Sequence, residues 1–545
     1  MAELLHDLLA EAAAARPAAT AVRDADGAWT YTELDRAADA CAAWLADRGV
    51  RPGDRVLARL GNARPFVALL FGALRAGAVF VPVGTAMKRF QLARVVADAE
   101  PSLAVAQGAD TGLLKELMRE LPKELPKELP KEPGTAPVYD VAELPEAGAA
   151  PRTRARVRPD DLALLMYTSG STSMPKAVMT PHRAAVFVTG AIAERLRYRA
   201  EDVVLNAIPF SFDYGLYQVF LTVAAGAELV VSRTDSHVGL MTLLHRHAVT
   251  VFPVVPSLAE LVLRLAARDG RPAPPVRLFT STGAAFNRPV IDGLRAAFPG
   301  ARIAPMYGTT ECKRITVLEP DGDLDHPHSV GRALTGTQVL VLDDAGHPLP
   351  PGETGEIAVR GPHVMAGYWR APDLTRERFR TDPRTGTVTL HTGDYGRLDA
   401  DGHLYVEGRR DDLFKRRGVR MSALEIEAAA LDVPGVRSAA LLPPADGADM
   451  VLYVAADRPA AEVLALLAER LEPAKVPPVC HVRAELPLTP NGKTDKKALA
   501  ATPPAPVTPP APSASSVPSA SSVPSASSVP PAPSASPAPA DRSAA

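Results

Sequence analysis

Short apolar runs alternate with longer amphipathic stretches along much of the chain. Stretches such as SLAELVLRLAAR (257–268) have the apolar spacing of a helix, and they separate several of the runs. Buried strands that alternate with helices predict a parallel α/β sheet flanked by helices. The apolar runs end at turn residues and read LALLMY (162–167), DVVLNAIP (202–209), ELVVS (228–232), VTVFPVVP (249–256), VRLFTSTG (276–283) and ARIAPMYG (301–308).

The pattern changes in the last third of the chain. Between Gly336 and Tyr405, short alternating runs with tight turns predict an antiparallel, barrel-like part. Residues 411–500 mix helical and strand-like stretches, as a small mobile α+β domain would. We therefore expect a large domain over 1–410, a small C-terminal domain over 411–500 and a tail over 501–545.

Two stretches have an unusual composition. A repeat of ELPK runs from Glu120 to Pro133, and its regular prolines oppose a continuous helix, so we expect an exposed surface insertion over 113–134. The tail over 501–545 consists mostly of proline, alanine, serine and valine and contains three copies of SASSVP. Such a composition cannot bury enough apolar surface to order the chain, so we expect disorder, with a tethering or partner-binding role as the alternative.

Charge and cysteine content narrow the class of protein. The chain has 545 residues with a net charge of −2, which does not indicate a nucleic-acid partner. Three widely spaced cysteines indicate reduced thiols and a cytoplasmic protein, without a metal-binding pattern. The N-terminus lacks the features of a signal peptide. The longest apolar stretch, Phe66 to Val83, contains Arg75 and is predicted to be a buried helix followed by a strand rather than a membrane span.

A loop rich in hydroxyl groups and glycine follows the apolar run at 162–167. It reads TSGSTSMPK from Thr168 to Lys176. The backbone N–H groups and hydroxyls of such a loop can bind phosphate oxygens, and a lysine adds a positive charge. The Walker A pattern, counted from Gly170, requires glycine at 175 and serine or threonine at 177, where this chain has Pro175 and Ala177. The residues alone leave two alternatives, a phosphate loop of another kind and a plain surface loop.

This loop and other stretches resemble motifs of the adenylate-forming, AMP-binding superfamily, which includes acyl-CoA synthetases and the adenylation domains of peptide synthetases. The likeness extends over about residues 5–500. One departure is that the family usually has glycine where Ser173 and Ala177 stand, which narrows the backbone conformations of the loop. The matching stretches are TSGSTSMPK, MYGTTE (306–311), HTGDYGRLDADGHLYVEGRRDDLFKRRGVRMSALEIE (391–427) and PLTPNGKTDKKAL (487–499).

The resemblance implies an enzyme that uses ATP and Mg²⁺ to activate a carboxylic acid as an acyl-adenylate, with release of pyrophosphate. Lys493 would bridge the acid and the α-phosphate, Thr310 would contact that phosphate, and Asp411 would be the hinge of the small domain. Glu311 and Thr172 would bind the metal. The implied ATP-binding residues are Thr168, Ser169, Gly170, Ser171, Thr172, Lys176, Gly283, Ala284, Ala285, Tyr307, Gly308, Asp394 and Arg409.

The acid pocket of the family corresponds to Pro209–Phe220 here. Asp213 stands where amino-acid-activating members carry an aspartate that pairs with the substrate ammonium; otherwise it would cap a helix or pair with a nearby arginine. Lys313 and Arg314 follow Glu311 and would bind a second substrate carboxylate, unless they are surface residues with partners elsewhere. The expected substrate-binding residues are Asp213, Tyr214, Tyr217, Met306, Lys313 and Arg314. This set resembles the stand-alone amino-acid or β-amino-acid subgroup.

The implied acceptor is the thiol of coenzyme A or of a carrier-protein phosphopantetheine that acts in trans. One alternative is a fatty-acid or aryl-acid CoA ligase that does not recognise an amine. Another is a non-catalytic relative that only binds nucleotide. The presence of Lys493, Glu311 and Asp394 together argues against the second alternative.

Overall fold

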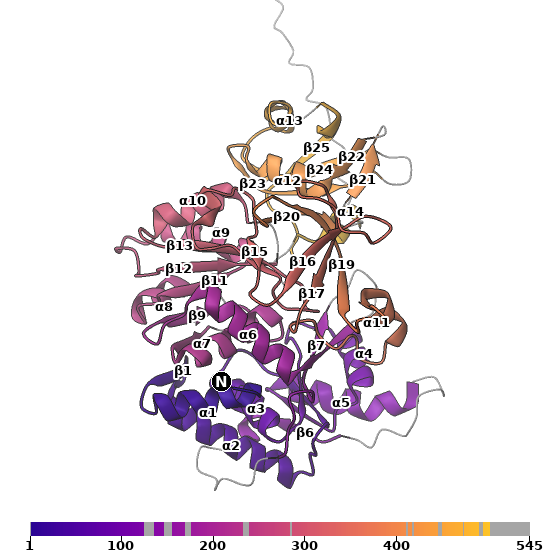
Figure 1. The fold of residues 1–545 in the computed structure, drawn as a ribbon. Coiled ribbons are helices and arrows are strands. Elements are labelled where there is room, and N and C mark those ends of the chain that lie inside the picture. The colour runs from indigo at the N-terminus through magenta and orange to yellow at the C-terminus, as the bar shows by residue number, and fades with distance from the viewer. Residues whose placement is uncertain are drawn as a thin grey trace, which may run out of the picture. The chain divides into compact units, whose positions relative to one another are not determined.

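The computed structural model describes residues 2–124, 136–145, 155–168, 176–232, 239–283, 286–409, 413–416, 419–444, 449–471, 473–489 and 494–501. The large part of the chain consists of two mainly parallel sheets with helices packed on them and an antiparallel sheet that follows in sequence (Figure 1). The predicted α/β class with a barrel-like antiparallel part and a small C-terminal α+β part is confirmed.

Within the described residues, the largest sheet has nine strands, and its central strands are parallel. All of the predicted apolar runs except 162–167 form strands of this sheet. In spatial order the strands are β15 (Arg332–Ala333), β14 (Thr316–Val317), β13 (Arg302–Tyr307), β12 (Leu278–Ser281), β11 (Val251–Val254), β9 (Val203–Asn206), β10 (Glu228–Val231), β1 (Thr20–Asp24) and β2 (Gly27–Thr30).

The second sheet has six strands among the described residues and contains the run at 162–167. Only its last pair, β7 and β8, is antiparallel. The order is β6 (Val138–Asp140), β5 (Leu103–Ala106), β3 (Arg55–Arg59), β4 (Val79–Pro82), β7 (Leu162–Thr168) and β8 (Lys176–Pro181).

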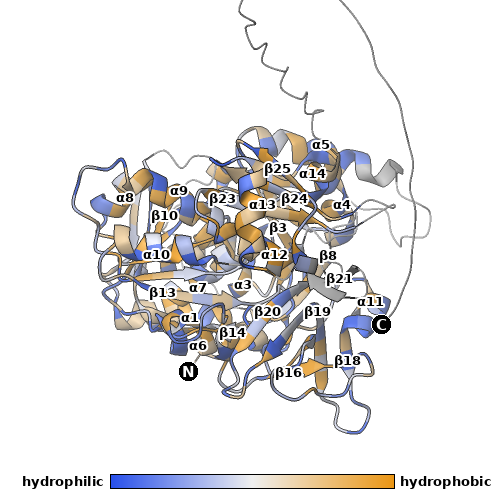
Figure 2. Ribbon diagram, turned by 90° about the horizontal axis from the view of Figure 1, so that it is seen from above, coloured by the Kyte–Doolittle hydropathy of each residue, from blue (hydrophilic) through white to orange (hydrophobic). Residues whose placement is uncertain are grey.

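Helices cover both sheets, and many of them are amphipathic. Figure 2 shows both hydrophobic and hydrophilic residues on outer helices such as α8. The helices of the large part are α1 (Leu5–Ala15), α2 (Tyr31–Asp47), α3 (Arg64–Arg75), α4 (Arg89–Ala99), α5 (Ala109–Glu124), α6 (His182–Leu196), α7 (Asp213–Ala225), α8 (Leu240–Arg246), α9 (Pro256–Ala266), α10 (Arg288–Ala297) and α11 (Pro372–Arg378).

The apolar stretch at 66–83 forms the buried helix α3 and strand β4, as the sequence predicts. Its one charge, Arg75, is fully buried and pairs with Asp35 and Asp39 of α2. A buried charge requires such partners, since an unpaired one costs several kcal/mol. Among the described residues, no helix is both long and apolar enough to cross a membrane.

Part of the expected surface insertion packs into the core. Residues 113–124 belong to α5, and Leu114, Leu117 and Met118 are buried against the second sheet. Residues 125–135 lie outside the described residues, so the bounds of the insertion stay a prediction. The same holds for the tail over 501–545, of which only residue 501 is described.

Two further groups of strands complete the described chain. The antiparallel sheet consists of β16 (Gln338–Leu342), β17 (Gly355–Arg360), β19 (Val388–Leu398), β18 (Phe379–Thr381) and β20 (Leu404–Arg409). The C-terminal part contains β21 (Leu413–Arg416), β22 (Val419–Ser422), α12 (Ala423–Leu431), β23 (Val436–Leu442), β24 (Val451–Ala456), α13 (Ala460–Ala468), β25 (Val479–Arg483) and α14 (Lys496–Ala501).

Candidate active site

The two ends of the hydroxyl-rich loop are held together by the last strands of the six-stranded sheet. Strand β7 leads into the loop and β8 leads out of it, and Thr168 pairs with Lys176 across the antiparallel ladder. The Thr168 hydroxyl donates to the Lys176 carbonyl at 3.4 Å. Ser169, Gly170, Ser171 and Thr172 lie outside the described residues.

A tight turn after β13 carries Glu311. The turn is closed by the Ile315 N–H, which donates to the Tyr307 carbonyl at 2.9 Å. Gly308 sits where the chain doubles back, and a Cβ there would lie 2.1 Å from the Lys313 carbonyl oxygen, so only glycine fits. Lys313 itself adopts a left-handed backbone with φ of 63°. The turn thereby places Thr310 and Glu311 at the end of β13, while Met306 stays on the strand.

The Glu311 carboxylate is already oriented by a side chain that the sequence did not suggest. The Tyr368 hydroxyl donates to Glu311 Oε1 at 2.5 Å, and the Met365 N–H donates to the Glu311 carbonyl at 2.9 Å. A hydrogen bond of this length to a carboxylate is of the strong, charge-assisted kind.

Asp394 of β19 is held in a similar way. The Tyr307 hydroxyl donates to Asp394 Oδ2 at 2.6 Å, and the Thr392 hydroxyl accepts from the Asp394 N–H at 3.1 Å. Burial, with the Asp394 carboxylate next to it, raises the pKa of Tyr307 well above its usual value, so the hydroxyl remains a donor at neutral pH. Arg409 of β20 is paired with Asp394 across the ladder. Strands β13 and β19 thus bring Tyr307 and Asp394 into contact, and Glu311 lies four residues after Tyr307 in the turn.

The structure describes only some of the other residues that were predicted to bind the nucleotide or to form the hinge. Strand β12 ends at the buried Ser281, and Gly283 follows with φ of 94°. Ala284, Ala285, Asp411 and Lys493 lie outside the described residues, as does the side chain of Arg409.

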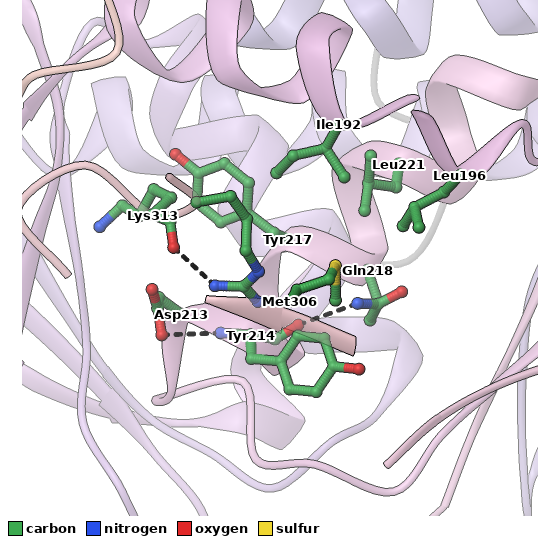
Figure 3. Close-up of a pocket in the computed structure, with 10 residues that line it drawn as sticks. Ile192, Leu196, Asp213, Tyr214, Tyr217, Gln218, Leu221, Met306 and Lys313 are labelled. Carbon is green, nitrogen blue, oxygen red and sulfur yellow. Dashed lines mark hydrogen bonds between the residues drawn. The ribbon is translucent and has the colours of Figure 1, made fainter. Parts of the chain in front are cut away.

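A small pocket lies between α6, α7 and the end of β13 (Figure 3). The six residues predicted to bind the acid all line it. Four further lining residues were not predicted, namely Ile192, Leu196, Gln218 and Leu221. Gln218 and Leu221 follow Tyr214 at helical spacing on α7, so that spacing was a signal for them.

The pocket contains one buried acid and two buried bases. Asp213, Lys313 and Arg314 are 5%, 1% and 4% exposed. Asp213 is the first residue of α7, and its Oδ1 accepts from the Tyr214 N–H at 2.9 Å. The Arg314 guanidinium donates to the Lys313 carbonyl at 2.6 Å and lies 4.8 Å from the centre of the Tyr214 ring. Lys313 and Arg314 are therefore buried in the pocket wall and are not surface residues.

The ammonium of Lys313 stands out among these charges. Among the residues that the structure describes, its Nζ has no hydrogen-bond partner, and the same is true of the Tyr217 hydroxyl. The Lys313 Nζ lies 5.7 Å from the centre of the Tyr217 ring. Burial lowers the pKa of Lys313, while the carboxylates of Asp213 and Glu311 oppose that shift. A buried ammonium without a hydrogen-bond acceptor is costly, so Lys313 is a candidate for binding an anionic group.

The chain is similar to known proteins over most of its length. Residues 9–369 match the family model described as AMP-binding enzyme. The chain is 32% identical over 498 residues to the L-proline–[L-prolyl-carrier protein] ligase of Streptomyces coelicolor, covering 88% of this chain and 93% of that one. It is 30% identical to a linear gramicidin synthase of Brevibacillus parabrevis, over 91% of this chain, but spans only 6% of that much longer protein.

The chain is also similar to solved structures. The structure of VinN in complex with L-aspartate is 43% identical, with a TM-score of 0.66, and covers 74% of this chain and 98% of that one. The ATP-bound structure of MatB from Rhodopseudomonas palustris is 27% identical, with a TM-score of 0.79, and covers 92% of this chain and 98% of that one.

Proposed function

Because this chain belongs to the AMP-binding family of adenylate-forming ligases, we propose that it activates a small amino acid with a second carboxylate and transfers it to a carrier-protein thiol. The observation that carries this proposal is the pocket in which Asp213, Lys313 and Arg314 are buried together and the Lys313 Nζ has no hydrogen-bond partner among the described residues. A substrate ammonium would pair with Asp213, and a second carboxylate would pair with Lys313 and Arg314.

The molecules that two relatives bind or act on support this substrate class. VinN binds L-aspartate and 3-methylaspartate in solved complexes, and both molecules carry one amine and two carboxylates. The proline ligase of Streptomyces coelicolor acts on an amino acid and a carrier protein. A fatty acid or simple aryl acid would leave the buried Lys313 ammonium without a hydrogen-bond acceptor, which argues against the alternative of a CoA ligase without amine recognition.

In the proposed first step, an oxygen of the substrate carboxylate attacks the α-phosphorus of ATP. A new C–O–P linkage forms, and the bond between the α-phosphorus and the bridging oxygen of pyrophosphate breaks. Repulsion between anions dominates the barrier, so positioned cations and donors supply most of the catalysis. Lys493 would bridge the attacking carboxylate and the α-phosphate, and the loop residues from Thr168 to Lys176 would hold the β- and γ-phosphates.

Mg²⁺ fits the site through the chemistry of its donors, since carboxylate and hydroxyl oxygens are its preferred protein ligands. Glu311 would bind it together with Thr172. The ion would neutralise charge on the phosphates. Asp394 would accept hydrogen bonds from the ribose hydroxyls, a role that an ionised carboxylate can fill.

In the second step, the thiolate of a phosphopantetheine attacks the acyl carbonyl and AMP leaves. Rotation of residues 411–500 about Asp411 would expose the face used for this step. Three free, buried cysteines fit a reducing cytoplasm.

ATP–pyrophosphate exchange tests the proposal. We expect exchange with aspartate-like amino acids, and none with fatty or aryl acids. Exchange with fatty acids but not with amino acids would contradict the proposed substrate class. Loading of a purified carrier protein and of coenzyme A, compared side by side, would identify the acceptor.

A further inference from the structure

The segment Met365–Arg370, which we call the strap, runs alongside β8. Strand β8 is the strand that follows the phosphate loop in the sequence. The Ala366 N–H donates to the Met179 carbonyl at 3.0 Å, and the Met179 N–H donates to the Gly367 carbonyl at 2.9 Å. The Trp369 N–H donates to the Ala177 carbonyl at 2.9 Å, and Tyr368 forms an antiparallel bridge with Val178. The strap is thus attached to the strand that begins at Lys176.

Successive side chains of the strap make different attachments. The Tyr368 hydroxyl reaches Glu311 at 2.5 Å. The Trp369 Nε1–H donates to the Asp98 carbonyl at 3.0 Å. The Asp98 carboxylate also accepts from the Tyr167 hydroxyl at 2.6 Å, and Tyr167 is the residue before Thr168. The strap and both ends of the phosphate loop are therefore linked through α4 and β8.

Two features fix the strap where Tyr368 leaves it. Gly367 has φ of 107°, and a Cβ there would lie 2.4 Å from Cγ2 of Thr375, so the backbone approaches α11 closely. The Tyr368 N–H donates to the Thr375 hydroxyl at 2.9 Å, and its ring packs edge-on against Phe379 at 5.5 Å between centres. Tyr368 is only 7% exposed. The close backbone contact and the packed ring hold the Tyr368 hydroxyl in one position, next to Glu311.

We infer that Tyr368 is a positioning residue that fixes the Glu311 carboxylate for the metal–nucleotide complex and ties it to β8, the strand that begins at Lys176. A glutamate side chain has several rotatable bonds, and a hydrogen bond to Oε1 selects one orientation of the carboxylate. Each carboxylate oxygen accepts more than one bond, so a hydrogen bond at Oε1 is compatible with metal ligation. Partners that orient a metal ligand in this way commonly change metal affinity when they are removed.

This inference rests on the proposed function, because it requires Glu311 to bind the metal of a nucleotide complex. The substitution Tyr368→Phe removes only the hydroxyl and keeps the packing against Phe379. The control is Tyr405→Phe, since the Tyr405 hydroxyl also donates to a carboxylate, that of Asp399, at 3.2 Å, in a hairpin outside the site.

The experiment measures the affinity of each protein for α,β-methylene-ATP by calorimetry, once with Mn²⁺ and once with EDTA. The ratio of the two affinities is the metal-dependent gain. We expect Tyr368→Phe to reduce this gain about tenfold, while the affinity in EDTA stays the same. Tyr405→Phe should change neither value. Thermal unfolding of both variants checks that the proteins remain folded.

The variant Glu311→Gln separates failure of the inference from failure of the proposed function. It should abolish the gain, and adding Tyr368→Phe to it should cause no further loss. If Glu311→Gln keeps the gain, Glu311 does not bind the metal and that part of the proposed function is wrong. If Glu311→Gln loses the gain but Tyr368→Phe keeps or increases it, Tyr368 is a packing residue or a competitor of the metal, and the inference alone is overturned.

Discussion

The acid pocket and the nucleotide side of the site treat their charged groups in opposite ways. On the nucleotide side, each described carboxylate is held by a tyrosine, Glu311 by Tyr368 and Asp394 by Tyr307. In the acid pocket, the Lys313 Nζ has no hydrogen-bond partner among the described residues. In the proposed function, the nucleotide side would be oriented before its ligand arrives, whereas the pocket would be completed by the charges of its ligand.

This difference has a physical consequence for specificity. A site whose buried polar groups remain without partners rejects molecules that cannot supply them, because each group then keeps its desolvation penalty. The acid pocket should therefore discriminate strongly between acids, while the nucleotide side should contribute affinity and orientation. Substitutions on the two sides should separate these effects.

The largest expected effect is that of Asp213→Asn. It removes the charge that would pair with the substrate ammonium and leaves that ammonium buried. Breaking a buried pair costs about 3–5 kcal/mol, so kcat/KM for an aspartate-like acid should fall about 150- to 4,000-fold. ATP–pyrophosphate exchange measures this.

The control for this change is Asp401→Asn, which removes the same charge from an exposed turn. An unchanged exchange rate for Asp213→Asn would mean that Asp213 has only a structural role at the start of α7, where its carboxylate accepts from the Tyr214 N–H.

The next effect is that of Arg314→Met, which should depend on the substrate. β-Alanine is aspartate without the α-carboxylate, so it offers no group to Arg314. A hydrogen bond between charged groups contributes about 1.5–3 kcal/mol, so exchange with aspartate should fall about 10- to 150-fold while exchange with β-alanine changes little. Equal losses for both acids would show that Arg314 supports the pocket wall without contacting a second carboxylate.

The sequence predicted the fold well where the pattern of apolar residues was long and regular. The run at 162–167 and the stretch at 66–83 form the predicted β7, α3 and β4, because burial between helices requires continuous apolar residues. The insertion over 113–134 stays a prediction, because residues 125–135 lie outside the described residues, although Leu114 and Leu117 of α5 are buried.

For the site, the resemblance to a family identified candidate residues, but not the contacts among them. Tyr368 is 57 positions from Glu311, and Tyr307 is 87 positions from Asp394. Such pairs form only when separate strands meet, and no local periodicity records them. The burial of Lys313 was also hidden, because it follows from the tight turn at Gly308 and not from the polarity of its neighbours.

A smaller effect is expected on the nucleotide side from Tyr307→Phe. Asp394 would lose one hydrogen bond but keep its place on β19. A single hydrogen bond contributes about 0.5–1.5 kcal/mol, so KM for ATP should rise about two- to tenfold, with KM for the acid unchanged. Initial-rate kinetics with each substrate varied in turn measure this. A rise in KM for the acid of equal size would mean that the two sides are not independent.

The smallest expected effect is on stability, and it has the opposite sign. Lys313→Met replaces a buried ammonium by an apolar side chain of similar length, so the free protein should become more stable by about 1 kcal/mol or more at neutral pH, although acid binding is impaired.

This gain in stability should depend on pH, because burial lowers the pKa of Lys313 in the folded state. At pH values between the pKa of Lys313 in the folded protein and its pKa in the unfolded chain, the unfolded state binds more protons than the folded state. The wild type therefore gains stability as the pH rises through this range. The advantage of Lys313→Met should therefore shrink towards pH 10.5, the ordinary value for lysine. Urea unfolding at several pH values measures this, with the exposed Lys88→Met as the control. A loss of stability in Lys313→Met at neutral pH would show that the ammonium is satisfied in the free protein, and the contrast between the two sides of the site would fail.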